Sequence, residues 1–415
     1  MQFTREEAAM LDGDAGASVR RAMQLLVALG EAYGADRMVE VSSVHLAGPN
    51  VAILDNEPID YVEEMASDGT RFRVPTTTTT QSVDWDLNRE LAIPGENQSK
   101  QERLTRLFAQ MGAILTHTCA PYIAGNIPNW GEHIAWGESS AVIYANSVLG
   151  ARTNREGEAT TIASAITGRT PNYGYHLAEN RRGEYLVIVE APLSDATDYG
   201  VLGHYIGSLV GGGVPVFSGV NQATTDQLKQ MGAALASSGG VPLYHVVGVT
   251  PEARDSEEAW QGCRPRETIV VGEREMKTAY DHLCKATVET ADVVSLGCPH
   301  TSIQELKEIA TSIVGQRINP RTMMWVNTSA ATKMLSDRMG YTQAIEAAGA
   351  FLVKDTCPIN SQALSKAFVV ERGYKTLITN SAKQAHYSPA MCNLMPCLGT
   401  LSECVRWAVA GRWSK

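Results

Sequence analysis

A repeated switch between two hydrophobic periods is the feature that most constrains the fold. Residues 5–33 carry apolar side chains at helical intervals, and the next segment, 38–45, is a strand-like run. A helical stretch at 223–232 likewise precedes a strand-like one at 242–249, and a short apolar run lies at 185–189. Such alternation is typical of parallel strands joined by crossover helices. The sequence therefore predicts an α/β fold.

The chain length, the net charge and the lack of a signal peptide argue against several classes of protein. A chain of 415 residues, 44% of them hydrophobic, can bury a sizeable core, and we expect three α/β regions at residues 1–200, 201–290 and 291–415. The formal net charge is -10 and the chain has no long basic run, so the sequence indicates no basic surface for nucleic acid. No apolar run reaches the roughly 18 residues that span a bilayer, so we expect no membrane partner. Sparse cysteines and the lack of a signal peptide predict the cytoplasm.

Three of the eight cysteines share one local context. Cys119, Cys298 and Cys357 each follow an apolar run, and a proline comes one or two residues later. Loops at the carboxyl ends of parallel strands meet where an open α/β sheet binds its substrate, so three thiolates can converge there. Thiolates are the usual ligands of iron-sulfur clusters, and a set of three leaves iron an open position for Lewis-acid chemistry. Spacing alone leaves the alternative open that these cysteines are small buried hydrophobes.

Long ungapped blocks carry a family resemblance. In the blocks 42–45, 118–122, 131–141, 146–157 and 380–383, the chain resembles the large subunit or catalytic domain of aconitase X, over nearly its whole length. The resemblance implies an aconitase-like fold of three α/β/α domains around a central cleft, without the small swivel domain. It also implies a hydro-lyase that removes water from a small hydroxy acid.

The resemblance further implies a cofactor and a partner. Cys119, Cys298 and Cys357 correspond to the family's iron ligands, in an iron-sulfur cluster of the 2Fe-2S or 4Fe-4S type or around mononuclear iron. The family's swivel domain brings a serine thought to act as the general base, and residues up to 415 leave no room for that domain. We therefore expect a separate small swivel-domain subunit that supplies the serine.

Candidate site residues follow from the family blocks and from side-chain chemistry. We assign catalytic roles to Glu138, Ser139 and Lys383, with Lys383 as the cation for a substrate carboxylate. Small or polar residues that can approach or clamp a substrate form the binding set: Ser43, His45, Gly48, Pro49, Asn50, Thr79, Thr80, Ser140, Arg152 and Ser381.

These candidates also have purely structural interpretations. Residues 138–140 can cap a helix, and the threonine run at 76–80 favours a strand. His45 can be a hydrogen-bonded core histidine, and Arg152 a surface or interface charge.

Known members of the family dehydrate cis-3-hydroxy-L-proline or 5-phosphomevalonate. We favour cis-3-hydroxy-L-proline, because Pro49 lacks a backbone donor and Thr79 stands where the family often has asparagine, in loops that could hold a phosphate. Mevalonate 5-phosphate is the alternative substrate. A non-catalytic iron-sensing or RNA-binding protein is the alternative of another class, and the net charge of -10 argues against RNA.

Overall fold

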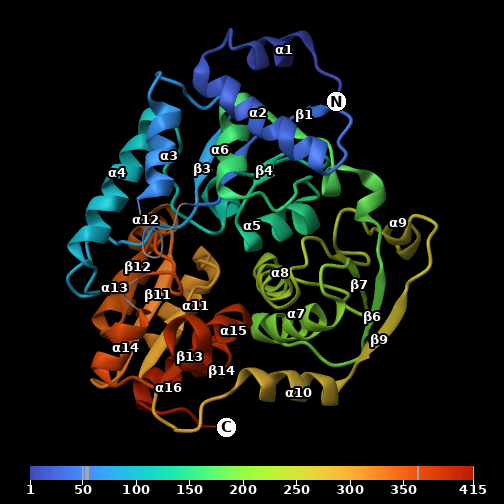
Figure 1. The fold of residues 1–415 in the computed structure, drawn as a ribbon. Helices are drawn as coiled ribbons and strands as arrows, with labels where there is room; N and C mark the ends of the chain where they lie inside the picture. The colour runs from blue at the N-terminus through green and yellow to red at the C-terminus, as the bar shows by residue number, and fades with distance from the viewer. Residues whose placement is uncertain (49–50, 52–55, 362–363, 415) are drawn as a thin grey trace.

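The computed structural model describes residues 1–48, 51, 56–361 and 364–414. Within them the chain forms three α/β units, which follow one another along the sequence (Figure 1). The three larger sheets are parallel throughout, and one two-stranded ribbon is antiparallel. The predicted α/β class with largely parallel sheets is confirmed. No helix in these ranges is long and apolar enough to cross a membrane.

The first unit is a three-stranded parallel sheet covered by helices, with the antiparallel ribbon β1-β5 beside it. Its strands are β1 (Met38–Glu40), β2 (Val44–Leu46), β3 (Thr76–Thr78), β4 (Ala135–Trp136) and β5 (Arg169–Pro171). Its helices are α1 (Arg5–Asp12), α2 (Ala17–Ala32), α3 (Glu57–Ala66), α4 (Gly95–Met111), α5 (Ser139–Tyr144), the π-turn η2 (Ala145–Leu149) and α6 (Glu158–Thr167). Residues 38–45, expected as one strand, form two, because β1 pairs with β5 whereas β2 joins β3 and β4.

The second unit is a four-stranded parallel sheet in the order β8-β7-β6-β9. Its strands are β6 (Tyr185–Val189), β7 (Pro215–Ser218), β8 (His245–Val246) and β9 (Glu267–Val271), and its helices are α7 (Ala196–Val210), α8 (Thr225–Gly239), α9 (Ser256–Trp260) and α10 (Glu273–Leu283). The run 242–249 yields only the two-residue β8, because Val249 and Thr250 turn back to the Val246 carbonyl. The boundary expected at residue 200 falls inside α7, and we propose a boundary before β6 instead, since β6 pairs with β7 and β9.

The third unit is a five-stranded parallel sheet in the order β12-β11-β10-β13-β14. Its strands are β10 (Val293–Leu296), β11 (Met323–Thr328), β12 (Phe351–Lys354), β13 (Thr376–Thr379) and β14 (Met395–Leu398). Its helices are α11 (Ile303–Ile313), α12 (Ala330–Arg338), α13 (Tyr341–Ala347), α14 (Lys366–Arg372), α15 (Ala382–Cys392) and α16 (Leu401–Ala410). Separate apolar clusters pack around this sheet, so its strands read as near-continuous apolar runs.

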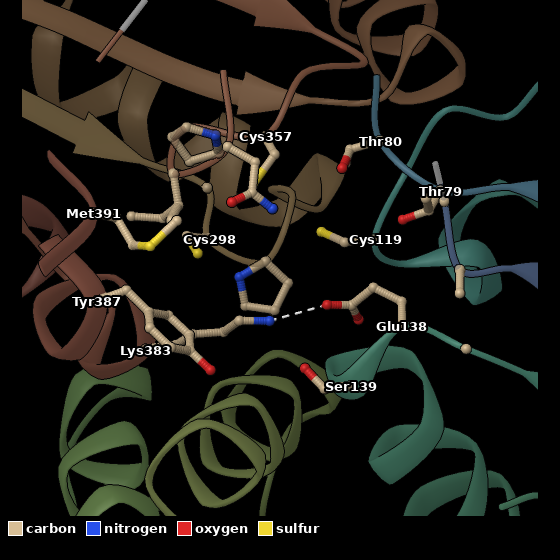
Figure 2. Close-up of a pocket in the computed structure, with 18 residues that line it drawn as sticks. Thr79, Thr80, Cys119, Glu138, Ser139, Cys298, Cys357, Lys383, Tyr387 and Met391 are labelled. Carbon is tan, nitrogen blue, oxygen red and sulfur yellow. Dashed lines mark hydrogen bonds and ion pairs between the residues drawn. The ribbon is translucent and has the colours of Figure 1, made fainter. Parts of the chain in front are cut away.

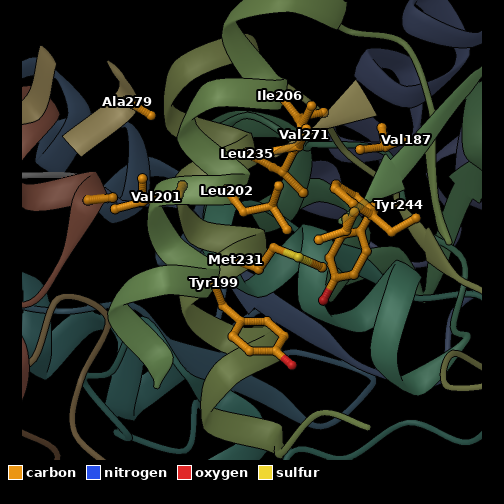
Figure 3. Close-up of a cluster of buried hydrophobic side chains, with 14 of the residues drawn as sticks. Val187, Tyr199, Val201, Leu202, Ile206, Met231, Leu235, Tyr244, Val271 and Ala279 are labelled. Carbon is orange, nitrogen blue, oxygen red and sulfur yellow. The ribbon is translucent and has the colours of Figure 1, made fainter. Parts of the chain in front are cut away.

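Helices α7 and α8 pack closely in the core of the second unit. Leu202 and Ile206 of α7 and Met231 and Leu235 of α8 belong to one buried cluster (Figure 3). The close approach depends on Gly203, because a Cβ atom there would stand 2.4 Å from the Met231 carbonyl oxygen. A backbone atom cannot move aside as easily as the end of a flexible side chain, so the added Cβ would strain the packing of the two helices.

Replacing Gly203 with alanine tests this contact. Alanine in a helix is ordinarily more stable than glycine by about 1 kcal/mol, but we expect Gly203→Ala to lower the free energy of unfolding by about 1–3 kcal/mol through overpacking. Urea denaturation measures the change. Gly212→Ala is the control, because no heavy atom lies within 4 Å of its added Cβ. A Gly203→Ala protein as stable as the parent would contradict the packing described.

Candidate active site

A cavity of about 340 Å³ is lined by loops and helix residues from the first and third units. Figure 2 shows side chains from both sides of the cavity. The predicted site residues that line it are Gly48, Thr79, Thr80, Cys119, Glu138, Ser139, Cys298, Cys357 and Lys383. Pro49 and Asn50 lie outside the described residues. The cavity thus gathers residues from positions 48 to 383, which the sequence keeps far apart.

Two of the three cysteines occupy the predicted position after a strand. Cys298 follows β10 and Cys357 follows β12, and both strands pair with β11 in the parallel sense, so the two loops leave the same edge of the sheet. Cys119 differs from the expectation, because the preceding segment makes only a single bridge, between Thr77 and Ile114. It reaches the cavity from the first unit, and all three cysteines line the same space.

Burial raises the pKa of all three thiols. That of Cys298 rises to about 12, with the neighbouring Cys357 adding to the effect of burial. The pKa values of Cys119 and Cys357 are raised as well. Without a bound metal ion the thiols are therefore protonated at neutral pH, and metal binding would release their protons.

The donor set suits iron. In the described ranges no three histidine, cysteine, aspartate or glutamate side chains stand together in the arrangement of a metal site. Nevertheless, three thiols line one cavity, and the backbone N–H of His300 donates to Cys119 Sγ at 3.3 Å. Thiolate ligands with N–H groups directed at sulfur are the usual surroundings of iron-sulfur centres.

An ion pair crosses the cavity between α15 and the start of α5 (Figure 2). Lys383 Nζ lies 3.0 Å from Glu138 Oε1 and also donates to Ser140 Oγ. Glu138 Oε2 accepts the Ala141 N–H at 2.8 Å, so the same carboxylate caps α5. The structural interpretation of residue 138 as a helix cap therefore coexists with its place in the cavity.

The pair keeps both partners charged despite their burial. Burial by itself would raise the pKa of Glu138, but the Lys383 ammonium and the Ala141 N–H outweigh it, so the pKa is lowered. Burial would likewise lower the pKa of Lys383, but Glu138 and the nearby cysteines raise it above its usual range. The cavity therefore presents a fixed ammonium and a weakly basic carboxylate.

Helix α15 contributes a face of the cavity of which the sequence predicted only Lys383. Lys383, Tyr387 and Met391 all line the space, at intervals of four residues. Side chains four apart lie on the same face of a helix, so the spacing from Lys383 is a signal that could have found the other two. The helix begins at Ser381, whose hydroxyl caps Gln384 N at 3.1 Å and donates to the Cys298 carbonyl.

Several predicted binding residues support the cavity from outside its lining. The Ser140 hydroxyl accepts a hydrogen bond from Lys383, and the Ser381 hydroxyl donates one to the Cys298 carbonyl. His45, fully buried on β2, makes a 2.9 Å hydrogen bond from Nδ1 to Thr77 Oγ1. Ser43 Oγ accepts the Trp136 indole N–H at 3.2 Å. Their positions are those of core residues rather than of groups that face a ligand in this cavity.

Arg152 was expected to clamp a substrate carboxylate, but it is not part of the cavity lining. Its Nη1 donates to the His176 carbonyl at 3.1 Å. Residues 133 and 152 also form a parallel bridge. The structure therefore does not bring Arg152 together with the predicted residues that line the cavity.

The Thr79–Thr80 loop is tied directly to the Cys357 loop. Gln81, the next residue, donates its N–H to the Asp355 carbonyl at 2.9 Å and forms a bridge with Thr356. Nearby, Asp84 Oδ2 accepts the Lys354 N–H at 2.8 Å. The first unit thereby fixes two threonine hydroxyls beside a cysteine of the third unit.

Comparison with known proteins assigns the family. The aconitase X first-domain, second-domain and third-domain models match residues 1–179, 183–281 and 291–410. The chain belongs to the aconitase X family. The structure is similar to that of Thermococcus kodakaraensis aconitase X in its holo-form, with a TM-score of 0.88, 35% identity, and coverage of 98% of this chain and 100% of the other.

Relatives of the chain are dehydratases. It is 43% identical to the phosphomevalonate dehydratase large subunit of Methanothermobacter thermautotrophicus, over 94% of each chain. It is 37% identical to the cis-3-hydroxy-L-proline dehydratase of Pseudomonas aeruginosa, over 97% of this chain and 69% of that protein. The predicted class is confirmed: the protein is an enzyme, a hydro-lyase with an aconitase-like fold.

Removing the ammonium from the cavity tests the ion pair. We expect Lys383→Gln to lower kcat/KM for dehydration by at least about 100-fold, because a fixed cation facing the reacting anion is lost. The free energy of unfolding should fall by about 2 kcal/mol, since Glu138 then stays buried without its partner. Steady-state kinetics and urea denaturation measure the two effects. Lys333→Gln, which breaks an i,i+4 pair with Asp337 on α12, is the control and should change neither by much.

His45 predicts an acid-dependent loss of stability. Burial lowers its pKa from 6.5 to about 4. Between these pH values the unfolded chain takes up a proton that the folded protein refuses, so stability present above pH 6.5 is lost as the pH falls. We expect His45→Asn to reduce the slope of unfolding free energy against pH by about 1.4 kcal/mol per pH unit in this window. Urea titrations from pH 4.5 to 7.5 measure it, and a slope in His45→Asn equal to that of the parent would contradict this role of His45.

Proposed function

We propose that this chain is the large subunit of an iron-dependent dehydratase that acts on a small hydroxy acid in the cytoplasm. One observation carries the proposal: three cysteines from distant segments line one cavity together with the Lys383–Glu138 ion pair. A reducing compartment suits this assignment, because it keeps the three thiols available as ligands.

Cys119, Cys298 and Cys357 would hold the iron, either as a mononuclear ion or in an iron-sulfur cluster. Bound there, it would supply a Lewis acid for the departing hydroxyl group. The protein's own contribution is to bind and orient the substrate. Lys383 provides a fixed ammonium for the carboxylate, and the hydroxyls of Thr79, Thr80 and Ser139 line the same space.

A general base supplied by a partner would complete the site. Glu138 is held ionised by Lys383, and its lowered pKa makes it a weak base. The relatives named as large subunits support a separate small subunit, and the Pseudomonas aeruginosa relative extends well beyond the part that this chain matches. We propose that this small subunit carries a swivel domain and supplies a serine as the base.

Among the two substrates of the named relatives, the cavity favours cis-3-hydroxy-L-proline. Lys383 is the only lysine or arginine among the lining residues that the structure describes, and it already balances Glu138. Pro299, Pro358, Ile359 and Met391 add apolar surface suited to the methylenes of a pyrrolidine ring. A phosphate together with a carboxylate would call for more positive charge.

Phosphomevalonate is the second candidate, and the comparisons favour it. The phosphomevalonate dehydratase large subunits of Methanothermobacter thermautotrophicus and Methanocaldococcus jannaschii are 43% and 39% identical to this chain. They are also nearly coextensive with it, at 94% and 100% of their own lengths.

Substrate turnover decides between them. The purified complex with the small subunit, loaded with iron under anaerobic conditions, is incubated with each compound, and the products are followed by mass spectrometry. We expect dehydration of cis-3-hydroxy-L-proline at a kcat/KM at least about tenfold above that for 5-phosphomevalonate. The reverse order would assign the second candidate, and turnover of neither would contradict the proposed substrates.

Loss of one cysteine tests the iron site. We expect Cys298→Ser to reduce bound iron by at least about tenfold and to abolish dehydration, because a hydroxyl is a poor substitute for a thiolate ligand. Iron per chain is measured by elemental analysis. Cys263→Ser is the matched control, since Cys263 is exposed and lies outside the cavity lining. Equal iron in Cys298→Ser and parent would contradict the assignment of this ligand.

A further inference from the structure

We propose that His300 is the positioning residue that holds the three cysteine loops together for metal binding. This inference rests on the proposed function, in which Cys119, Cys298 and Cys357 are the iron ligands. His300 follows Cys298 and Pro299 directly, it is only 1% exposed, and it does not line the cavity. It therefore contacts the cysteine loops without facing the cavity itself.

Each cysteine loop is connected to this one residue. The backbone N–H of His300 donates to Cys119 Sγ at 3.3 Å. Its ring Nδ1 lies 3.0 Å from Thr118 Oγ1, in the Cys119 loop, and its Nε2 lies 2.8 Å from the Thr356 carbonyl oxygen, in the Cys357 loop. The covalent chain supplies the third connection, to Cys298. Segments 182 and 56 residues away are thus fixed by the two ring nitrogens.

The hydrogen bonds define the state of the ring. A carbonyl oxygen only accepts, so Nε2 carries the proton and donates to Thr356. Nδ1 then accepts the Thr118 hydroxyl proton, while Thr118 Oγ1 itself accepts the Ala120 N–H at 3.1 Å. Both ring nitrogens are therefore satisfied in one tautomer.

The second unit holds the backbone of the same residue. Lys229 on α8, 2% exposed, donates from Nζ to the His300 carbonyl at 3.3 Å. Asp226 Oδ1 lies 2.9 Å from the same ammonium, and Glu305 also pairs with it. Residues 118, 229 and 356 belong to the first, second and third aconitase X domains. His300 is therefore a point at which all three domains act on the cysteine loops.

Shorter and longer amides separate the two ring contacts. Asparagine places a polar atom near the position of Nδ1 and loses the contact to Thr356, whereas glutamine reaches the position of Nε2 and loses the contact to Thr118. We expect His300→Asn to release the Cys357 loop and His300→Gln to release the Cys119 loop. Each should weaken iron binding by about 10-fold to 100-fold, the effect usual for groups that orient metal ligands.

The experiment measures iron affinity in the purified complex by competition with a chelator, together with the visible absorption spectrum. Hydrogen exchange of the metal-free chain gives a readout independent of loading: faster exchange at residues 357–361 in His300→Asn, and at 118–120 in His300→Gln. Thr118→Val removes the hydrogen bond between Thr118 and His300, which is the same bond that His300→Gln removes. The two changes combined should therefore weaken iron binding by much less than the product of their separate effects.

His245→Asn is the matched control. His245 is 2% exposed and its Nε2 lies 2.7 Å from a backbone carbonyl, that of Arg181, but it stands in the second unit away from the cavity. It should cost stability without changing iron affinity or the spectrum. Parent-like affinity in both His300 variants, or an equal loss in His245→Asn, would overturn the role of His300. A parent complex that binds no iron through its cysteines would instead overturn the proposed function.

Discussion

Parallel pairing of β10, β11 and β12 places the segments that follow β10 and β12 at one edge of the sheet. In a parallel sheet every carboxyl end points the same way, so loops that are 59 residues apart in sequence emerge side by side. The cavity depends on this geometry, because Cys298 and Cys357 are placed by it before any side chain makes a contact. The neighbouring strand β13 adds α15, with Lys383, at the same edge.

The first unit completes the site through contacts that cross to the third. Gln81 pairs with the segment just before Cys357, and Asp84 accepts the Lys354 N–H. From the same unit come Cys119 and Glu138, the partners respectively of His300 and Lys383. The site is therefore assembled between units, and its geometry depends on how the units dock as much as on each local fold.

Burial gives the cavity its chemical character. Thiols that are buried together resist ionisation, so a metal ion bound there would have to displace their protons. Lys383 and Glu138 remain charged only because each stands beside the other. His300 is buried as well, and its two ring hydrogen bonds make it a fixed donor and acceptor between the cysteine loops.

The sequence by itself determined the α/β class, the family, the three cysteine loops and Lys383, because hydrophobic period and local motifs are written along the chain. It differs from the structure where pairing between distant segments decides: residues 38–45 divide between two sheets, and Cys119 follows no strand. Tyr387 and the role of His300 also escaped it. Only the tertiary structure could decide these, because a hydrogen bond across 182 residues leaves no periodic trace in the sequence.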